Sequence, residues 1–314
     1  PVCVLYSLMG VAASFDQKQT SKCASLIQSH LALKNKTSDH GFTWGNKIIG
    51  TGEYSTVYRG YQRESRLPIA VKKIQAKNLT KVRKTRIMNE IAIMNQICKL
   101  PDHDKYFVTL LDAFSDDLAN AFIVTKFIEG QELYKIATAH PTGLSERVVR
   151  QMMRQILLAV HVLHQNDIAH RDIKLENIIF DKDSKRLKLI DFGFATKTSS
   201  INSNGNKVQN SSSLFCGSVH YVAPEIVLEQ PHDSKKVDIW ALGVLAYTLF
   251  TGEFPFDNSN QQILLKSIAN GNFTLPRNLS PEAKALLNDL LLVNPTKRPS
   301  AASLLHHSWW TIEL

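Results

Sequence analysis

Short β-type runs, each bounded by turn residues, dominate the chain from residue 42 to about residue 75. These runs predict three strands, at residues 44–49, 55–61 and 67–74. A helical run follows, in which apolar residues recur at spacings of three to four, at Ile87, Ile91, Met94 and Ile97. The same spacing places Glu90 near the apolar face, so we expect an inward-facing acid in a small, mostly β unit.

The pattern becomes mostly helical after an apolar strand predicted at residues 121–125. A helix is predicted over residues 148–164, with Ser145 as N-cap and apolar positions at Val148, Met152, Ile156, Val160 and Leu163. Residues 237–251 predict a buried helix, and residues 281–292 and 300–309 predict amphipathic helices. Residues 197–214 are rich in Ser and Asn, so we expect a mobile loop there. The second unit is therefore expected to be larger and mostly α.

The two ends of the chain carry weaker patterns. Residues 1–41 show no strong period, and we expect them to form a loosely ordered extension. The apolar stretch at residues 2–15 is shorter than the ~20 residues of a membrane span, so no span is expected. Because the chain begins with Pro1, a truncated signal sequence is left open as an alternative.

Composition narrows the class of protein. The 314 residues are 44% hydrophobic and 21% charged, which is typical of a soluble globular protein and excludes collagen-like or wholly disordered chains. The four cysteines have no C-x-x-C spacing, so we expect no zinc site or disulfide framework and a cytosolic or nuclear location. The formal net charge of +9 permits phosphate-bearing partners. The one basic run is expected to be a solvated helix face and consists of Lys77, Lys81, Arg83, Lys84 and Arg86.

Two features of the first unit suit phosphate binding. The glycine-containing turn at residues 49–57 lets backbone N–H groups approach phosphate oxygens, although G-x-G also fits an ordinary β-hairpin. Lys72 ends the strand-like run Ile69-Ala70-Val71 and can pair with phosphates, with Glu90 holding its ammonium group. A surface lysine at a strand end is the alternative for Lys72 taken alone.

The second unit concentrates polar chemistry in two short segments. Residues 170–177 read His-Arg-Asp-Ile-Lys-Leu-Glu-Asn, and residues 191–193 read Asp-Phe-Gly. Acids, an amide and cations gather here among apolar neighbours, which is costly unless a charged ligand is bound. Asp172 can accept the proton of an attacking hydroxyl, Lys174 can offset phosphoryl charge, and Asn177 and Asp191 offer hard oxygens to Mg²⁺. A salt-bridge network without catalysis is the alternative.

At these residues the sequence resembles the eukaryotic protein kinase superfamily. The match runs in order from about Phe42 to Trp310 and includes the later markers Ala223-Pro224-Glu225, the segment 238–243, and Arg298. The resemblance implies an α+β, bilobal kinase fold: an N-lobe at residues 42–127, mostly β with one regulatory helix, and a mostly α C-lobe at 128–310, with 311–314 as a tail.

The resemblance implies roles for individual residues. Asp172 is the catalytic base, Lys174 its phosphate-neutralising partner, and Lys72 with Glu90 the ion pair of the active state. Asn177 and Asp191 are the metal ligands, so ATP and Mg²⁺ are the implied cofactors. The implied nucleotide-binding positions are Ile49, Gly50, Thr51, Gly52, Glu53, Ser55, Val57, Ala70, Lys72, Thr125, Lys126, Ile128 and Ile179.

Finer resemblances concern substrate and regulation. Lys174 and Gly217-Ser218 resemble serine/threonine kinases, and residues 243–247 and 251–256 look most like the calcium/calmodulin-dependent-kinase-like group. Glu132 and Glu176 align with acids that contact upstream Arg in basophilic kinases, so protein substrates with Arg or Lys before the Ser or Thr are expected; surface acids without substrate contact are the alternative. Leu214 replaces a common activating threonine.

The regulatory state and two rival functions are left open. Ser203, Ser211, Ser212 and Ser213 are candidate acceptors for an upstream activating kinase. A pseudokinase scaffold is one rival, although the residues it normally loses are in place. A nucleic-acid-binding module is the other, and it lacks aromatic interleaving or a known motif, so no nucleic-acid partner is expected. We expect a monomeric signalling enzyme.

Overall fold

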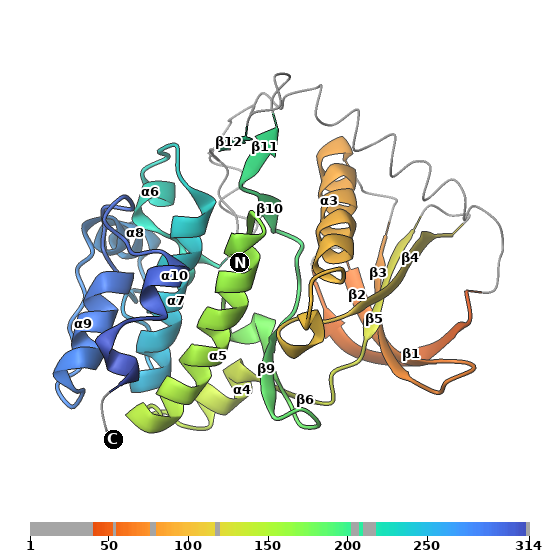
Figure 1. Cartoon of the computed structure of the whole chain (residues 1–314), viewed down its shortest axis with the longest axis horizontal. Helices are drawn as coiled ribbons and strands as arrows, with labels where there is room; N and C mark the ends of the chain where they lie inside the picture. Colours follow the sequence, from red (N-terminus) through yellow and green to blue (C-terminus); the bar gives the residue numbers. More distant parts are fainter. Residues whose placement is uncertain are drawn as a thin grey trace. The chain divides into compact units, whose positions relative to one another are not determined.

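The computed structural model describes residues 40–52, 55–75, 80–116, 120–201, 207–209 and 218–311 (Figure 1). The chain forms two compact units: the first ends at Asn95 and adds Thr109–Phe127, and the second comprises Gln96–Val108 and the chain from Ile128 onward. The first is mostly β and the second mostly α, as the predicted α+β class requires. Within the described residues, no helix is long and apolar enough to cross a bilayer.

The division between the units differs from the predicted single boundary after residue 127. Residues 96–108 belong to the second unit, because Phe107 forms a parallel β-bridge with Leu189. The ring of Phe107 also packs edge-on against Phe192, with 6.0 Å between the ring centroids. The strand pattern of the sequence cannot reveal this, since both partners lie more than 80 residues later in the chain.

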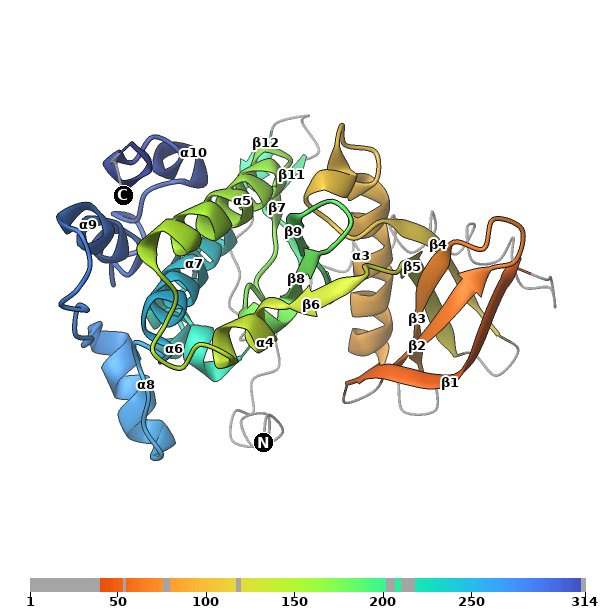
Figure 2. The ribbon, with the colours of Figure 1, turned by 90° about the horizontal axis from the view of Figure 1, so that it is seen from below.

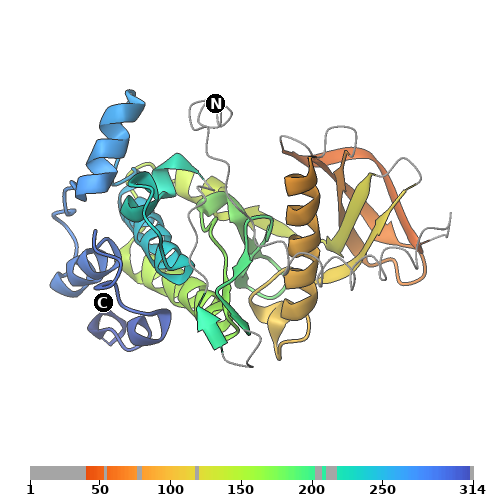
Figure 3. The ribbon, with the colours of Figure 1, turned by 90° about the horizontal axis from the view of Figure 1, so that it is seen from above.

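The first unit is a five-stranded antiparallel sheet with one helix, α3 (Lys81–Ile97), alongside it (Figure 3). The strand order is β1-β2-β3-β5-β4, with β1 (Phe42–Thr51), β2 (Ser55–Gln62), β3 (Pro68–Ile74), β4 (Leu110–Ser115) and β5 (Ala121–Lys126). Ile69, Val71 and Val124 are fully buried on one face. Because side chains alternate along a strand, Ala70 and Lys72 belong to the opposite face.

The second unit is built around α5 (Glu146–Gln165) and α7 (Ser234–Thr251), which lie side by side in Figure 2. Asp233 caps α7 by accepting a bond from the Lys235 N–H, and Gly252 ends it with φ 79°. The other helices are α4 (Leu133–Thr138), α6 (Pro224–Val227), α8 (Gln261–Asn270), α9 (Pro281–Leu290) and α10 (Ala301–Leu304). The 3₁₀ turns are η3 (His103–Lys105), η4 (Leu175–Asn177), η5 (Val219–Tyr221) and η6 (Ser308–Trp310).

Short strands complete the second unit. They are β6 (Gly130–Glu132), β7 (Ile168–Ala169), β8 (Ile178–Asp181), β9 (Arg186–Leu189), β10 (Thr196–Lys197), β11 (Ser199–Ile201) and β12 (Lys207–Gln209). The prediction of a loop at residues 197–214 is therefore wrong for its described part, where β10 pairs with β7 and β11 pairs with β12. Backbone hydrogen bonds form these ladders, and residues 197–214 contribute few apolar side chains to them, so composition did not indicate them.

Two helix predictions also need correction. The buried face of α5 runs through Val149, Met153 and Val160, so Val148 and Met152 are only half-buried, and the Ser145 side chain makes no capping bond. The helix predicted at residues 300–309 is broken into α10 and η6, because His307 caps the second turn by accepting the Trp309 N–H. That break brings the Trp309 indole to Glu146.

Glu146 joins three elements of the second unit. Its carboxylate accepts bonds from Ser280 N (3.1 Å), Ser280 Oγ (2.6 Å) and Trp309 Nε1 (2.7 Å), at the starts of α9 and η6. Burial raises the pKa of Glu146, but these bonds and the charge of Arg150 outweigh burial and hold the pKa below its ordinary value of 4.5.

Glu146→Gln should lower the free energy of unfolding by about 1–3 kcal/mol at neutral pH, because the half-buried carboxylate loses its charge and one of its two acceptor oxygens. Since the folded pKa is depressed, this contribution is present above pH 4.5 and disappears as pH falls through the folded value. Urea unfolding from pH 7 down to acid should show the variant and the natural protein converging. Glu64→Gln, an exposed acid in a turn, is the control, and a pH-independent difference would contradict the prediction.

Candidate active site

The first unit holds a lysine–glutamate pair. Lys72 on β3 places its Nζ 2.7 Å from Oε1 of Glu90 on α3. The Glu90 side chain is 6% exposed, as the helical spacing predicted, while Ile87, Ile91 and Met94 on the same helix are buried. Lys72 is therefore an oriented cation on the sheet face opposite Ile69 and Val71, and the surface-lysine alternative is wrong.

The glycine-containing turn joins β1 and β2 in the first unit. Gly50 pairs with Val57, and the turn closes where the Gly52 N–H donates to the Ser55 carbonyl at 2.8 Å. A Cβ on Gly52 would lie 2.9 Å from Ser55 Oγ, so a side chain there would displace Ser55. Glu53, a predicted nucleotide-binding residue, lies outside the described residues.

The remaining predicted nucleotide-binding residues fall on both units. In the first, Ala70 lies directly opposite Thr125 in the β3–β5 pair, and Lys126 follows Thr125 at the end of β5. In the second, Ile128 begins the segment before β6, and Ile179 lies on β8, half-buried. Apart from Lys126, small or apolar side chains therefore occupy these predicted nucleotide-binding positions.

The acid of the predicted catalytic loop, residues 170–177 of the second unit, is tightly held. Asp172 is 5% exposed, and its Oδ2 lies 2.8 Å from both Lys174 Nζ and Asn177 Nδ2. The same amide group of Asn177 also donates to the Asp172 carbonyl at 2.9 Å. Two donors on one oxygen fix the direction of the carboxylate. Sequence analysis placed these three side chains together, and the structure does so.

Asn177 and Asp191 each present an oxygen suited to a hard cation. Because the Asn177 amide nitrogen is used toward Asp172, its Oδ1 is the atom left as an acceptor. Asp191 is exposed, has φ 57°, and accepts the Gly193 N–H on Oδ1 at 3.1 Å. The φ value lies in the left-handed region, where Asp is one of the tolerated residues.

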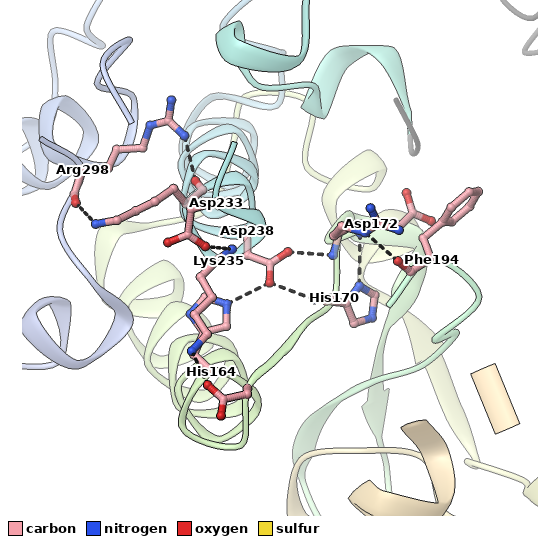
Figure 4. A network of polar contacts seen from close by, with 11 residues as sticks. His164, His170, Asp172, Phe194, Asp233, Lys235, Asp238 and Arg298 are labelled. Carbon is pink, nitrogen blue, oxygen red and sulfur yellow. Dashed lines mark hydrogen bonds and ion pairs between the residues drawn. The ribbon is translucent and has the colours of Figure 1, made fainter. Parts of the chain in front are cut away.

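Asp238 on α7 anchors the catalytic loop, a role that sequence analysis missed. Its carboxylate accepts the backbone N–H groups of His170 (2.9 Å) and Arg171 (2.7 Å), and the His164 ring from α5 at 2.8 Å (Figure 4). The Asp238 side chain is fully buried. The available signal was a lone acid within an apolar helix, because burying it is costly unless several donors meet it.

Arg171 and Phe192 connect the loop to the segment after Asp191. Arg171 Nε donates to the Phe194 carbonyl at 2.8 Å, and the backbone of Arg171 has φ 62°. The Phe192 ring is 1% exposed and packs against His170, with 5.2 Å between centroids. The candidate phosphate acceptors Ser203 and 211–213, together with Leu214, lie outside the described residues.

A buried ion pair joins Glu225 on α6 to Arg298 of the second unit. Arg298 donates from Nη1 and Nη2 to the two carboxylate oxygens of Glu225, at 2.8 and 2.6 Å. Both side chains are at most 1% exposed. Three backbone carbonyls also accept from Arg298, so the guanidinium is fully coordinated by protein groups.

Comparison with known proteins places this arrangement in a family. The protein kinase domain model matches residues 45–310. Sperm motility kinase 3A of Mus musculus is 33% identical over 84% of this chain and 49% of its own length. NUAK family SNF1-like kinase 2 of Homo sapiens is 35% identical over 84% of this chain and 39% of its own length.

The chain thus spans about half, or less, of the length of the curated relatives it matches. NUAK family SNF1-like kinase 1 of Mus musculus is 34% identical over 84% of this chain and 38% of its own length. These relatives agree with the resemblance to serine/threonine kinases of the calcium/calmodulin-dependent-kinase-like group. The domain match, which covers most of the chain, shows that this chain belongs to the protein kinase family.

Proposed function

We propose that this chain transfers the γ-phosphate of ATP to Ser or Thr hydroxyls of protein substrates. The observation that carries the proposal is the Asp172 carboxylate, held at 2.8 Å by both Lys174 and Asn177. A buried, oriented carboxylate at this position can accept the proton of an attacking hydroxyl. Lys174 stands beside it as a cation that offsets charge on the transferred group.

Asn177 and Asp191 fit Mg²⁺ as ligands. The described residues contain no cluster of three His, Cys, Asp or Glu side chains that would hold a metal by themselves. Mg²⁺ needs less from the protein, because it takes one or two oxygen ligands and completes its shell with phosphate oxygens and water. When bound, it neutralises phosphate charge. The Asn177 side chain has its nitrogen directed to Asp172, which leaves its oxygen for the cation.

Lys72 and the glycine-containing turn supply the first unit's share of nucleotide binding. Glu90 holds the Lys72 ammonium at 2.7 Å, which is the paired arrangement required for contact with α- and β-phosphates. The glycine-containing turn, whose Gly52 N–H is already bonded to the Ser55 carbonyl, lets the backbone come close to the same anion. The pseudokinase alternative is disfavoured, because the pair is formed and Asp172 and Asp191 are retained.

Transfer of labelled γ-phosphate tests the proposal. The purified chain is incubated with ATP and an Arg-rich Ser/Thr peptide library, with and without Mg²⁺, beside Asp172→Asn and Lys72→Met. We expect Mg²⁺-dependent label on peptide that both variants lose. If the natural chain binds ATP but labels nothing, even after treatment with an upstream kinase, the proposal is wrong and a scaffold role replaces it.

We further propose a preference for Arg or Lys upstream of the acceptor. Glu176 is exposed on η4, two residues from Lys174, and Glu132 ends β6 with its side chain 38% exposed. Lys135 on α4 places its Nζ 3.7 Å from Oε2 of Glu132. This contact is weak, and a substrate guanidinium can replace it. Both acids then offer charge-assisted bonds to a basic peptide.

Glu176→Gln should weaken kcat/KM for peptides with upstream Arg about tenfold, since a hydrogen bond to a charged group contributes about 1.5 kcal/mol. Peptides with Ala at that position should be unaffected. A positional peptide library read for Glu176→Gln, Glu132→Gln and the control Glu64→Gln measures the effect. Acidic or proline-directed preference in the natural chain would contradict the proposal.

A further inference from the structure

The segment between α5 and Asp172 begins at a conformationally unusual residue. Asp167 follows the end of α5 at Asn166 and has φ 55°, in the left-handed region that non-glycine residues seldom adopt. Asp and Asn are the side chains that tolerate this region best apart from Gly, because their polar groups bond locally. β7 follows immediately, and His170 comes directly after β7. The backbone direction at Asp167 therefore sets the path into the catalytic loop.

The Asp167 side chain is held by α7. Lys235 Nζ lies 3.1 Å from Asp167 Oδ1, and the two side chains are only 27% and 25% exposed. Lys235 is three residues before Asp238, so the two lie on one face of α7, a turn apart. Asp238 holds the backbone of His170 and Arg171, as described above. One helix face thus contacts both ends of residues 167–171.

The Asp167 backbone holds a second segment. Its carbonyl accepts the Thr198 N–H at 2.8 Å. This bond continues the β7–β10 ladder, in which Ala169 pairs with Thr196 and Ile168 with Lys197. Residues 196–198 begin two residues after the Asp191-Phe192-Gly193 segment ends. Asp167 is therefore the point at which α7, the catalytic loop and the strand after Asp191 meet.

We propose that Asp167 and Lys235 are positioning residues for phosphoryl transfer, acting through the backbone of residues 167–171 and Thr198. The inference rests on the proposed kinase activity. Neither side chain touches Asp172; the pair instead limits rotation of the entry turn, while Asp238 fixes the other end of the segment. A small displacement of a catalytic group lowers the rate by a large factor. The clamp formed by Asp167 and Lys235 should therefore have a measurable effect on kcat even if it is weak.

The effect is measured with Lys235→Met, Asp167→Gly and the double variant. Gly accepts φ 55° without strain, so Asp167→Gly removes the carboxylate while permitting the turn. We expect kcat to fall about tenfold in each single variant, with KM for ATP unchanged. The double variant should be no slower than either single one, because the two share one interaction. Lys235→Arg should retain activity, and Lys266→Met, an exposed lysine on α8, is the control.

Hydrogen exchange provides a readout that does not need activity. In Lys235→Met the amides of His170 and Thr198 should exchange about tenfold faster than in the natural chain and in Lys266→Met, while amides within α9 keep their protection. Unchanged exchange in Lys235→Met, or single variants whose losses in kcat add independently, would overturn the clamp. If the natural chain labels no peptide, the proposed function is wrong. Hydrogen exchange then still tests whether Asp167 and Lys235 hold residues 167–171 and Thr198 in place.

Discussion

Asp172→Asn should reduce the kcat of peptide phosphorylation by about 10³-fold, within the 10²–10⁴ range that a positioned general base contributes. The amide has nearly the same shape as the carboxylate but cannot accept the hydroxyl proton. It also removes the negative charge that lies 2.8 Å from Lys174 Nζ. The reaction is thus left with positioning and electrostatic stabilisation, but no base.

ATP affinity and the midpoint of thermal unfolding separate loss of the base from loss of the fold. Asn can still accept the Asn177 bond at 2.8 Å through its carbonyl oxygen, so both quantities should change little. Lys72→Met is the complementary variant, because it should act through the phosphates and the Glu90 partner rather than the hydroxyl. An Asp172→Asn chain with more than a tenth of natural kcat would exclude Asp172 as the base.

Arg298→Met should lower the free energy of unfolding by about 3–5 kcal/mol, the range found when one partner of a buried ion pair is removed. Glu225 would then be left ionised, or forced to take up a proton, in a site where its side chain is 1% exposed. Backbone carbonyls of Leu292, Val293 and Lys236 would also lose their donor.

Urea unfolding of matched variants tests the origin of this loss. Lys105→Met removes an exposed ion pair with Asp102 of 2.9 Å and should cost less than about 1 kcal/mol. The double variant Glu225→Gln with Arg298→Met should recover part of the loss, because no buried charge remains. An Arg298→Met cost equal to that of Lys105→Met would show that burial of the pair contributes nothing.

Local sequence predicted the parts of the site that lie within short segments. Helical spacing turned Glu90 inward, and the structure places it 2.7 Å from Lys72. Residues 170–177 contained the acid, the cation and the amide that meet at Asp172. Such groups are close in space because only a few residues separate them in the chain. Their spacing in the sequence therefore limits the distance between them.

Contacts across long stretches of chain had no such signal. Asp238 anchors His170 from 68 residues away and Arg171 from 67 residues away, and Lys235 reaches Asp167 across 68 residues. The bond from the Trp309 indole to Glu146 joins residues that are 163 positions apart in the chain.

The sequence by itself thus determined the family, the α+β class and the grouping of Lys72 with Glu90 and of Asp172 with its neighbours. The tertiary structure alone decided which helix holds the loop, to which unit residues 96–108 belong and where the helix predicted at residues 300–309 is interrupted. The physical reason is that periodicity and motif spacing report forces between near neighbours, whereas a buried charge or ring is stabilised by whichever distant partner the packing brings to it.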